Sequence, residues 1–239
     1  MDKISIKLTN VSKMYYLREE KATLSGSFLT RITTSDFWAL KNVDLEVKKG
    51  EQLGIIGPNG SGKTTLLQLM AGIIVPTKGQ VETNGKVVSI IDLSAGFQPE
   101  LSGRENVMIN GLLLGLGKAR IEASMNKIIK FADIGKFIDS PVYTYSAGMQ
   151  LRLGFGVVAY SNPDILLVDE SIAVGDREFR EKSLNKMSEF AKKGVTIVVA
   201  SHLVFLLKRI CKRIIRLDKG KIVSSGPTNK MIKEYEDLY

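Results

Sequence analysis

Residues 57–65 read Gly57-Pro58-Asn59-Gly60-Ser61-Gly62-Lys63-Thr64-Thr65. The segment before them, 52–56, is short, mostly apolar and β-branched at its end, as in a buried strand. The segment after them, 66–70, opens a helical pattern of apolar residues. A strand, a glycine-rich turn and a helix in this order surround an anion with backbone N–H groups and a helix N-terminus. The segment therefore predicts a phosphate-binding loop for a nucleoside triphosphate.

Two side chains of this loop have distinct predicted roles. We expect the ammonium of Lys63 to reach the β- and γ-phosphates and the hydroxyl of Thr64 to bind Mg²⁺. The alternative is a glycine-rich turn with a chance lysine. The strand on one side and the helix on the other make that alternative rare.

Composition limits the possible classes of protein. The 239 residues include 34 basic and 25 acidic side chains, giving a net charge of +9. This balance suits a phosphate ligand, a nucleic acid or an anionic membrane surface, and does not choose among them. The single cysteine, Cys211, excludes an internal disulfide. No apolar run approaches the roughly 18 residues needed to cross a bilayer, so any membrane contact is expected through a partner.

The N-terminal part of the chain predicts strands and one helix. Residues 4–8 and 43–47 alternate between apolar and polar side chains, which favours an antiparallel edge sheet with one wet face. Further strands are predicted at 81 and at 87–91, around an Asn84-Gly85 turn. Residues 17–38 predict a short amphipathic helix with an aromatic end. This helix would lie at a membrane interface, against a partner, or folded back on its own domain.

Helical patterns dominate from about residue 97 to 160, where Ser102 and Glu105 form a capping box. Apolar strands then follow at 165–168 and 195–200. An all-apolar strand is typical of the middle of a parallel sheet, and ligands bind beyond the carboxyl ends of such strands. The chain is therefore predicted to be an α/β protein with an inserted helical region.

Two carboxylates follow the strand at 165–168. We assign Asp169 to the Mg²⁺ site, together with Thr64. Glu170 is expected to orient or deprotonate the water that attacks the γ-phosphate. A helix cap or a surface ion pair is the less favoured alternative for this acidic pair.

Three motifs and a later lone histidine stand in a fixed order: 57–64, 145–152, 165–170 and His202. This set resembles the nucleotide-binding subunit of an ABC transporter over nearly the whole chain. The resemblance implies a P-loop NTPase (RecA-like) parallel sheet core with an antiparallel β edge subdomain and an inserted helical subdomain. It also implies a single nucleotide-binding domain over 1–239, with the helical subdomain at about 97–160.

In the family, two such domains sandwich two ATP molecules with Mg²⁺, and each site pairs the phosphate loop of one chain with the signature helix of the other. The resemblance implies that Ser146, Gly148 and Gln150 contact the nucleotide held by the second chain. The other implied roles are γ-phosphate binding by His202, adenine stacking by Tyr15 and contact with the opposite subunit by Asp176. On sequence alone, an ordinary packing role is about as compatible with the aromatic at 15, and a lone histidine after a strand is more often a capping or core residue.

Departures from the general family pattern indicate a subfamily. Ala147 and Met149 replace a glycine and a glutamine of the usual signature, and 171–176 replaces the common proline-threonine-serine run. Together with the stretch 96–106, they resemble the ATPases that export polysaccharides such as O-antigen, teichoic acid or capsule. In that subfamily the segment at 17–38 lies near the membrane. The coupling-loop glutamine would fall near Leu93, which leaves Gln98 a weak candidate.

This resemblance implies an ATPase, dimeric in action, on the cytoplasmic face of the membrane. Its partners would be a permease in two copies, a second copy of itself, and a lipid-linked glycan reached through the permease. A chain ending at Tyr239 is expected to lack the carbohydrate-binding β-domain that some relatives carry.

Three other functions remain open. Export of a lipid or drug is the nearest. A soluble ABC-type ATPase acting on nucleic acid is permitted by the positive charge, although no nucleic acid is expected because such proteins usually have two nucleotide domains or long coiled coils. A P-loop kinase would give no reason for the motif at 145–152.

Overall fold

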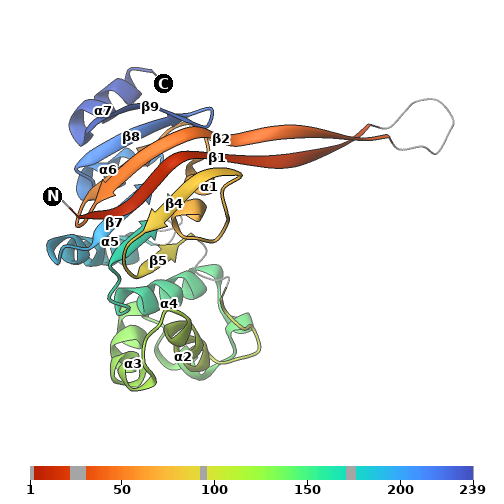
Figure 1. Ribbon diagram of the computed structural model, residues 1–239. Helices are drawn as coiled ribbons and strands as arrows, with labels where there is room; N and C mark the ends of the chain where they lie inside the picture. The colour runs from red at the N-terminus through yellow and green to blue at the C-terminus, as the bar shows by residue number, and fades with distance from the viewer. Residues whose placement is uncertain (1–2, 22–30, 92–95, 171–175, 239) are drawn as a thin grey trace.

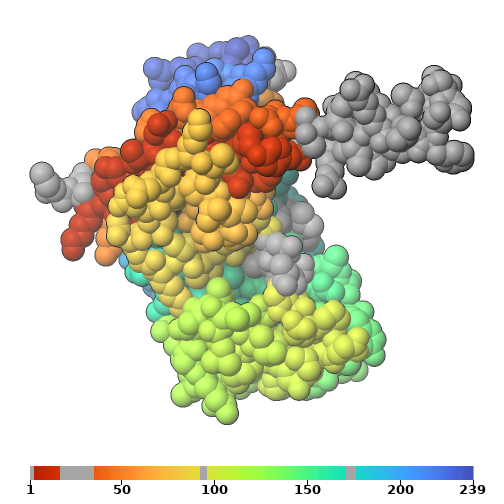
Figure 2. All heavy atoms as spheres, turned by 45° about the vertical axis from the view of Figure 1, so that its right-hand side comes forward, coloured from red at the N-terminus to blue at the C-terminus, as the bar shows by residue number. Residues whose placement is uncertain are grey.

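The computed structural model describes residues 3–21, 31–91, 96–170 and 176–238, and the side chains of 17–21 and 31–34 are not included. Within these residues the chain forms a central sheet, a smaller antiparallel sheet and a group of helices at one end (Figure 1). The space-filling view has the antiparallel sheet, in red, orange and yellow, between the blue C-terminal elements and the green helices (Figure 2). The α/β fold predicted from the sequence is confirmed.

The central sheet has the strand order β5-β6-β7-β3-β8-β9. Neighbours from β5 to β8 are parallel, and β9 pairs antiparallel with β8. The strands are β3 (Gln52–Ile56), β5 (Val87–Ile90), β6 (Ile165–Val168), β7 (Thr196–Ala200), β8 (Arg213–Asp218) and β9 (Lys221–Pro227). Every residue of β3, β6 and β7 is buried, as their apolar composition predicts for strands covered on both faces.

The antiparallel sheet has the order β2-β1-β4, with β1 at Ile4–Lys21, β2 at Arg31–Lys48 and β4 at Lys78–Thr83. The alternating residues of β1 and β2 place Ile6, Leu8, Val43 and Val47 in the core. The expected edge sheet is thus present. Beyond the core, the β1–β2 hairpin continues as a long arm (Figure 1).

The predicted amphipathic helix at 17–38 is wrong wherever the structure describes these residues. Residues 17–21 and 31–38 are strand, and the backbone ladder runs from Tyr15↔Phe37 to Lys21↔Arg31. The N–H and C=O groups of each strand form hydrogen bonds with those of the other strand. In a helix the same groups would have formed hydrogen bonds within the segment. Leu24 and Phe28, on which the helical spacing rested, lie outside the described residues.

The strands on either side of Asn84-Gly85 do not pair with each other. β4 pairs with β1 through Ile6↔Thr83, whereas β5 pairs with β6 through Val87↔Ile165. The chain therefore passes from one sheet to the other at this point. Gly85 has φ +123°, and the backbone N–H of Lys86 donates to Asp164, which fixes the crossing.

The helices near the central sheet are α1 (Lys63–Met70), α5 (Arg177–Lys192), α6 (Val204–Ile210) and α7 (Thr228–Glu236). The helical cluster comprises α2 (Gly103–Leu113), α3 (Lys118–Ala132) and α4 (Ala147–Ala159), with short 3-10 turns at Gly135–Asp139 and Val142–Thr144. The capping box of Ser102 and Glu105 is confirmed at the start of α2.

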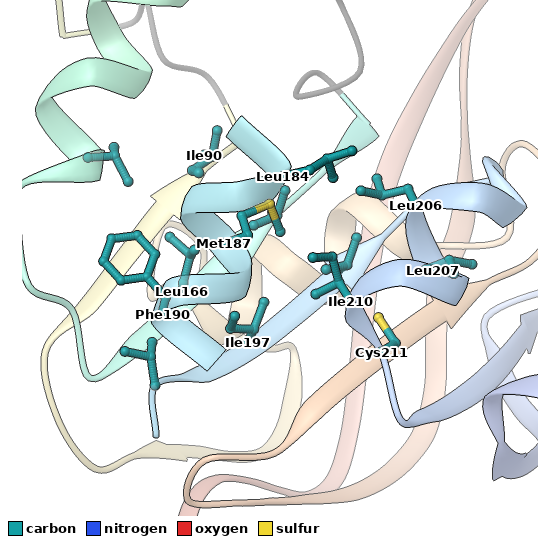
Figure 3. Packing of buried hydrophobic residues seen from close by; sticks show 14 of the residues in the cluster. Ile90, Leu166, Leu184, Met187, Phe190, Ile197, Leu206, Leu207, Ile210 and Cys211 are labelled. Atoms are coloured by element: carbon teal, nitrogen blue, oxygen red, sulfur yellow. The ribbon is translucent and has the colours of Figure 1, made fainter. Parts of the chain in front are cut away.

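Two apolar layers hold the central sheet in place. One packs α5 and α6 on the sheet through residues such as Leu166, Met187 and Leu207 (Figure 3). The other packs α1 and the antiparallel sheet on the opposite face, through Leu53, Leu66 and Val43. Truncating one of these fully buried side chains to alanine is expected to cost about 2–5 kcal/mol. This packing fixes the carboxyl ends of β3 and β6, where the predicted site residues begin.

Candidate nucleotide-binding site

A pocket of about 250 Å³ opens where the loop after β3 meets the end of β6. It is lined by Phe37, Ala39, Asn59, Gly60, Gly62, Lys63, Thr64, Thr65, Asp169, Glu170 and Ala200. The phosphate loop and the acidic pair, more than a hundred residues apart in sequence, are therefore brought to one pocket. Many of the side chains that line it are polar or charged, and charged donors such as Lys63 suit a phosphate ligand.

The glycines of the loop are there for two physical reasons. A Cβ on Gly57 would lie 2.1 Å from the carbonyl oxygen of Leu217, and one on Gly62 would lie 2.6 Å from that of Ala39. Gly62 and Gly60 also have φ of +105° and +75°. A Cβ on Gly60 would meet no protein atom within 4 Å, so this residue leaves its space open to a ligand.

The loop leads directly into α1, whose N-cap residue, Gly62, has no side chain to cap the helix. The first N–H groups of α1 thus remain available to an anion, and the helix dipole adds partial positive charge there. Ser61 is 2% exposed, and its hydroxyl has no hydrogen-bond partner among the described residues.

Lys63 is folded back onto its own loop. Its ammonium donates to the carbonyl oxygens of Gly57, at 2.8 Å, and Pro58, at 2.9 Å. Burial lowers the pKa of Lys63, and the negative charge of Glu170 opposes this shift. A phosphate group would offer this half-buried ammonium a stronger, charged acceptor than the two carbonyls.

Glu170 lines the pocket, and His202 contacts Glu170 although it is not itself among the lining residues. Oε2 of Glu170 lies 2.7 Å from Nδ1 of His202, which donates to the carboxylate. Glu170 follows β6 and His202 follows β7, the next strand in the sheet. Both side chains are about half exposed. A carboxylate held in this way can act on a water at the open side of the pocket.

Four predicted site residues on α4 and α5 do not line this pocket: Ser146, Gly148, Gln150 and Asp176. Ser146 caps α4, where its hydroxyl accepts from the N–H of Met149 at 3.2 Å. Gly148 lies in the first turn of that helix and a Cβ there would meet only the Ser146 hydroxyl, at 3.9 Å. Gln150 donates to the carbonyl of Val142. The start of α4 is thus an exposed helix N-terminus that does not line this chain's own phosphate pocket.

Asp176, the fourth, caps α5. Its Oδ1 accepts from the N–H of Phe179 at 2.8 Å, and its Oδ2 lies 3.7 Å from Nη1 of Arg152 on α4. The Phe179 N–H is the main cause of the lowered pKa of Asp176, and the charge of Arg152 adds to it. Asp176 therefore connects the start of α5 to α4.

Tyr15 also does not line the pocket, but its cross-strand neighbour does. Tyr15 pairs with Phe37, and directly opposed residues of an antiparallel pair share one face of the sheet. Phe37 reaches the pocket lining, while the ring of Tyr15 lies 5.3 Å from the ammonium of Lys13. No motif in the sequence assigns Phe37 to the site. The position of Phe37 at the pocket follows from the strand register, which the predicted helix at 17–38 did not include.

The residues present fit Mg²⁺ and a triphosphate. Thr64 and Asp169 supply hydroxyl and carboxylate oxygens to one pocket, and Mg²⁺ prefers oxygen ligands, completed by water and phosphate. The open space above Gly60 and the uncapped start of α1 suit phosphate oxygens. Fold and site together define a P-loop nucleotide-binding protein.

Comparison with known proteins gives the family. The profile of the family described as ABC transporter matches residues 40–173, which is more than half of the chain. The O-antigen export system ATP-binding protein RfbB of Klebsiella pneumoniae is 44% identical over 84% of this chain and 81% of its own length. The chain belongs to the ABC transporter family, and it is an ATP-binding protein of that family.

Longer relatives match as well. RfbB of Myxococcus xanthus is 43% identical over 93% of this chain and 49% of its own length. The teichoic acids export ATP-binding protein TagH of Lactococcus lactis is 43% identical over 98% of this chain and 51% of its own length. The chain thus spans about half the length of these two relatives.

Among solved structures, a dimeric post-hydrolysis state of the ATP-binding cassette MJ0796 bound to ADP and Pi matches with a TM-score of 0.76. It is 24% identical and covers 93% of this chain and 98% of that one, which supports the fold. Over the described residues, no helix combines the length and the apolar character needed to cross a membrane.

Proposed function

We propose that this chain is the ATP-hydrolysing subunit of an exporter of lipid-linked polysaccharide, of the O-antigen, teichoic acid or capsular type. Three of its relatives are named as O-antigen or teichoic acid export ATP-binding proteins, at 43–44% identity. In this proposal residues 1–239 form one nucleotide-binding domain, and about 97–160 is its helical subdomain. The domain docks on a membrane permease at the cytoplasmic face.

The pocket supplies the chemistry of hydrolysis. The N–H groups of residues 57–65 and the ammonium of Lys63 hold the phosphates, and Phe37 and Tyr15 are the aromatic candidates for the base. Thr64 and Asp169 would hold Mg²⁺, which neutralises charge that develops on the phosphates. Glu170 takes the proton of the attacking water, and His202 orients Glu170 and contacts the γ-phosphate.

The position of α4 supports a dimer as the active form. Ser146 and Gly148 stand at an exposed helix N-terminus, which favours a phosphate, yet they lie apart from this chain's own pocket. A second copy related by a two-fold axis would bring this helix start to the nucleotide of its partner. Asp176, joined to α4 by Arg152, would lie at the same interface. The observation that carries the proposal is this separation between the phosphate pocket and the signature helix.

The work of transport would come from opening and closing of this dimer. ATP bound between two chains favours the closed form, and hydrolysis removes that preference. The two permease subunits would follow this change through the helical cluster.

The experiment is a mild-detergent purification of tagged Glu170→Gln from native membranes with ATP and Mg²⁺. Glu178→Gln is the matched control, because Glu178 is an exposed glutamate at the start of α5, outside the pocket. We expect an ATP-dependent complex of two copies of this chain with a multi-span protein that has no nucleotide domain, and mass spectrometry should detect a polyprenyl-linked glycan. Co-purification of ribosomes or DNA in place of a membrane protein would exclude export. If the complex contained a drug or a simple lipid, the chain would still be a transporter subunit, but the exported substrate would not be a polysaccharide.

A further inference from the structure

A second pocket, of about 360 Å³, lies on the opposite side of β2 from the nucleotide site. It is lined by Ser12, Trp38, Lys41, Asn42, Lys78 and Lys221, which come from β1, β2, β4 and β9. None of these residues lines the nucleotide pocket. Phe37 lines one pocket and Trp38 the other, because successive side chains of a strand point to opposite faces.

The backbone of this pocket is held by the join between the two sheets. The N–H of Lys41 donates to the carbonyl of Gly220, which ties β2 to the turn between β8 and β9. The contact between orange β2 and the blue C-terminal strands can be followed in Figure 2. Lys221 follows that turn directly, so the tertiary fold brings it to Lys41 and Trp38. The pocket thus depends on four sequence regions, at residues 12, 38–42, 78 and 221.

Three exposed lysines line this pocket. Among the described residues, Lys41, Lys78 and Lys221 form no ion pair, although Lys7, Lys186 and Lys230 do so elsewhere on the surface. The ammonium of Lys78 lies 5.5 Å from the centre of the Trp38 ring. An anion bound between these positive charges would offset their mutual repulsion.

The rest of the lining is also rich in donors. The buried hydroxyl of Ser12 accepts from the N–H of Asn42 and donates to Oδ1 of the same residue. This fixes Asn42 and leaves its Nδ2 group as a donor. The indole N–H of Trp38 can only donate. The pocket therefore offers ammonium, amide and indole donors to an acceptor-rich ligand.

We propose that this pocket binds a phosphoryl group carried on an organic moiety, with the phosphate between the lysines and the organic part against Trp38. Lysine is a common phosphate ligand, and the apolar face of an indole packs on a sugar ring or a glycerol group. The volume exceeds what an inorganic anion needs, and the indole would have no role for such an ion. A sugar phosphate and a phospholipid headgroup share this chemistry. This proposal does not depend on the proposed function in polysaccharide export.

Trp38 is the single tryptophan of the chain, so its fluorescence reports on this pocket alone. The full chain is first saturated with a non-hydrolysable ATP analogue and Mg²⁺, so that phosphate probes do not occupy the phosphate loop. The probes are glucose 1-phosphate against glucose, and phosphatidylglycerol-containing vesicles against pure phosphatidylcholine vesicles. We expect a saturable change in Trp38 emission with a phosphorylated probe, and none with glucose or neutral vesicles. A response to glucose 1-phosphate indicates a soluble ligand, and a response to anionic vesicles alone indicates a headgroup.

The decisive variant is Lys41→Gln/Lys78→Gln/Lys221→Gln, which should lower the affinity at least tenfold. The control, Lys127→Gln/Lys193→Gln/Lys212→Gln, removes the same charge at exposed positions outside both pockets. Its affinity for the probe should stay within twofold of that of the unmodified chain. Raised salt should weaken binding, because the three ammoniums are exposed and screened. The proposal is overturned if no phosphorylated probe gives a saturable response. It is equally overturned if both triple variants weaken binding alike, since the effect would then be net charge.

Discussion

The carboxylate of Glu170 accepts a hydrogen bond from Nδ1 of His202 over 2.7 Å. The two residues are 32 positions apart and stand after adjacent parallel strands, so the sheet itself sets their distance. This pair is a polar link between the end of β6 and the end of β7. The hydrogen bond fixes the orientation of the Glu170 carboxylate beside the phosphate loop, and activity should therefore depend on both residues.

Replacing Glu170 by glutamine should leave ATP binding almost unchanged and lower turnover by about 10²–10⁴, the usual contribution of a general base. The amide keeps the size of the carboxylate but cannot take a proton. Steady-state phosphate release and equilibrium ATP binding measure the two effects separately. Glu178→Gln should match the unmodified chain in both. A Glu170→Gln protein with full turnover would refute the assignment.

Removing the imidazole should act in part through Glu170, in addition to the proposed contact of His202 with the γ-phosphate. His202→Ala is expected to lower turnover by about tenfold or more, and the same change in the Glu170→Gln background should have a smaller effect, which keeps only the part due to the γ-phosphate. The reason is that a positioning contact has nothing to position once the carboxylate is gone. A double-mutant cycle on turnover gives the coupling. Strictly additive losses would mean that the two residues act independently.

If Ser146 serves the nucleotide of a second chain, two inactive variants should restore each other. Lys63→Ala disables the phosphate loop, and Ser146→Arg blocks the start of α4 while leaving the pocket of its own chain intact. Each alone should be inactive. An equal mixture should recover about a quarter of the normal turnover, because about half of the dimers are mixed and each has one intact site. No recovery in a mixture that demonstrably forms mixed dimers would place both elements in one chain.

Replacing Gly57 or Gly60 by alanine should lower the free energy of unfolding by different amounts. Gly57→Ala drives a Cβ to within 2.1 Å of the Leu217 carbonyl, so the backbone must shift, and we expect a loss of about 3 kcal/mol or more. Gly60→Ala meets open space and costs only the strain of its positive φ, about 1 kcal/mol. Urea unfolding without nucleotide measures both. Equal losses would contradict the geometry of the loop.

The buried position of Lys63 predicts a pH effect on the nucleotide-free chain. Burial lowers the pKa of Lys63 in the folded protein, so between that value and the ordinary value the unfolded chain binds more protons. Stability from this group therefore rises with pH through that window. Relative to Lys63→Met, the unmodified chain should gain about 1 °C in melting temperature toward pH ~10, a small effect because the group is partly exposed.

The control for this measurement is Lys193→Met, which changes an exposed lysine at the end of α5. It measures the effect of removing one exposed positive charge over the same pH range. If the Lys63→Met difference followed the Lys193→Met difference at every pH, the folded protein would not hold Lys63 in a desolvated position.

Much of the fold could be predicted because single segments carry their own signal. The apolar run at 165–168, the glycine loop at 57–62 and the capping box at Ser102 each specify a local structure whatever surrounds them. The segment at 17–38 does not, because its described part is held by a ladder between β1 and β2. Spacing along one strand contains no information about its partner.

The same distinction applies to the site. Lys63, Thr64 and Asp169 follow from motifs, since their chemistry is set by neighbours in sequence. Phe37 enters the pocket through the register Tyr15↔Phe37, which is a tertiary property. The pocket around Trp38 was likewise invisible, because Lys41, Lys78 and Lys221 meet only when the two sheets join.

The close fit of Gly62 against the Ala39 carbonyl has a mechanical consequence. Gly62, the N-cap residue of α1, packs against the backbone of β2. β2 continues into the projecting arm of the hairpin (Figure 1). The arm and the phosphate loop thus share the backbone of β2, and their contact leaves no room for a side chain at residue 62. If a load on the arm displaces Ala39, the same load changes the affinity of the loop for its ligand, and by reciprocity the bound ligand resists that displacement.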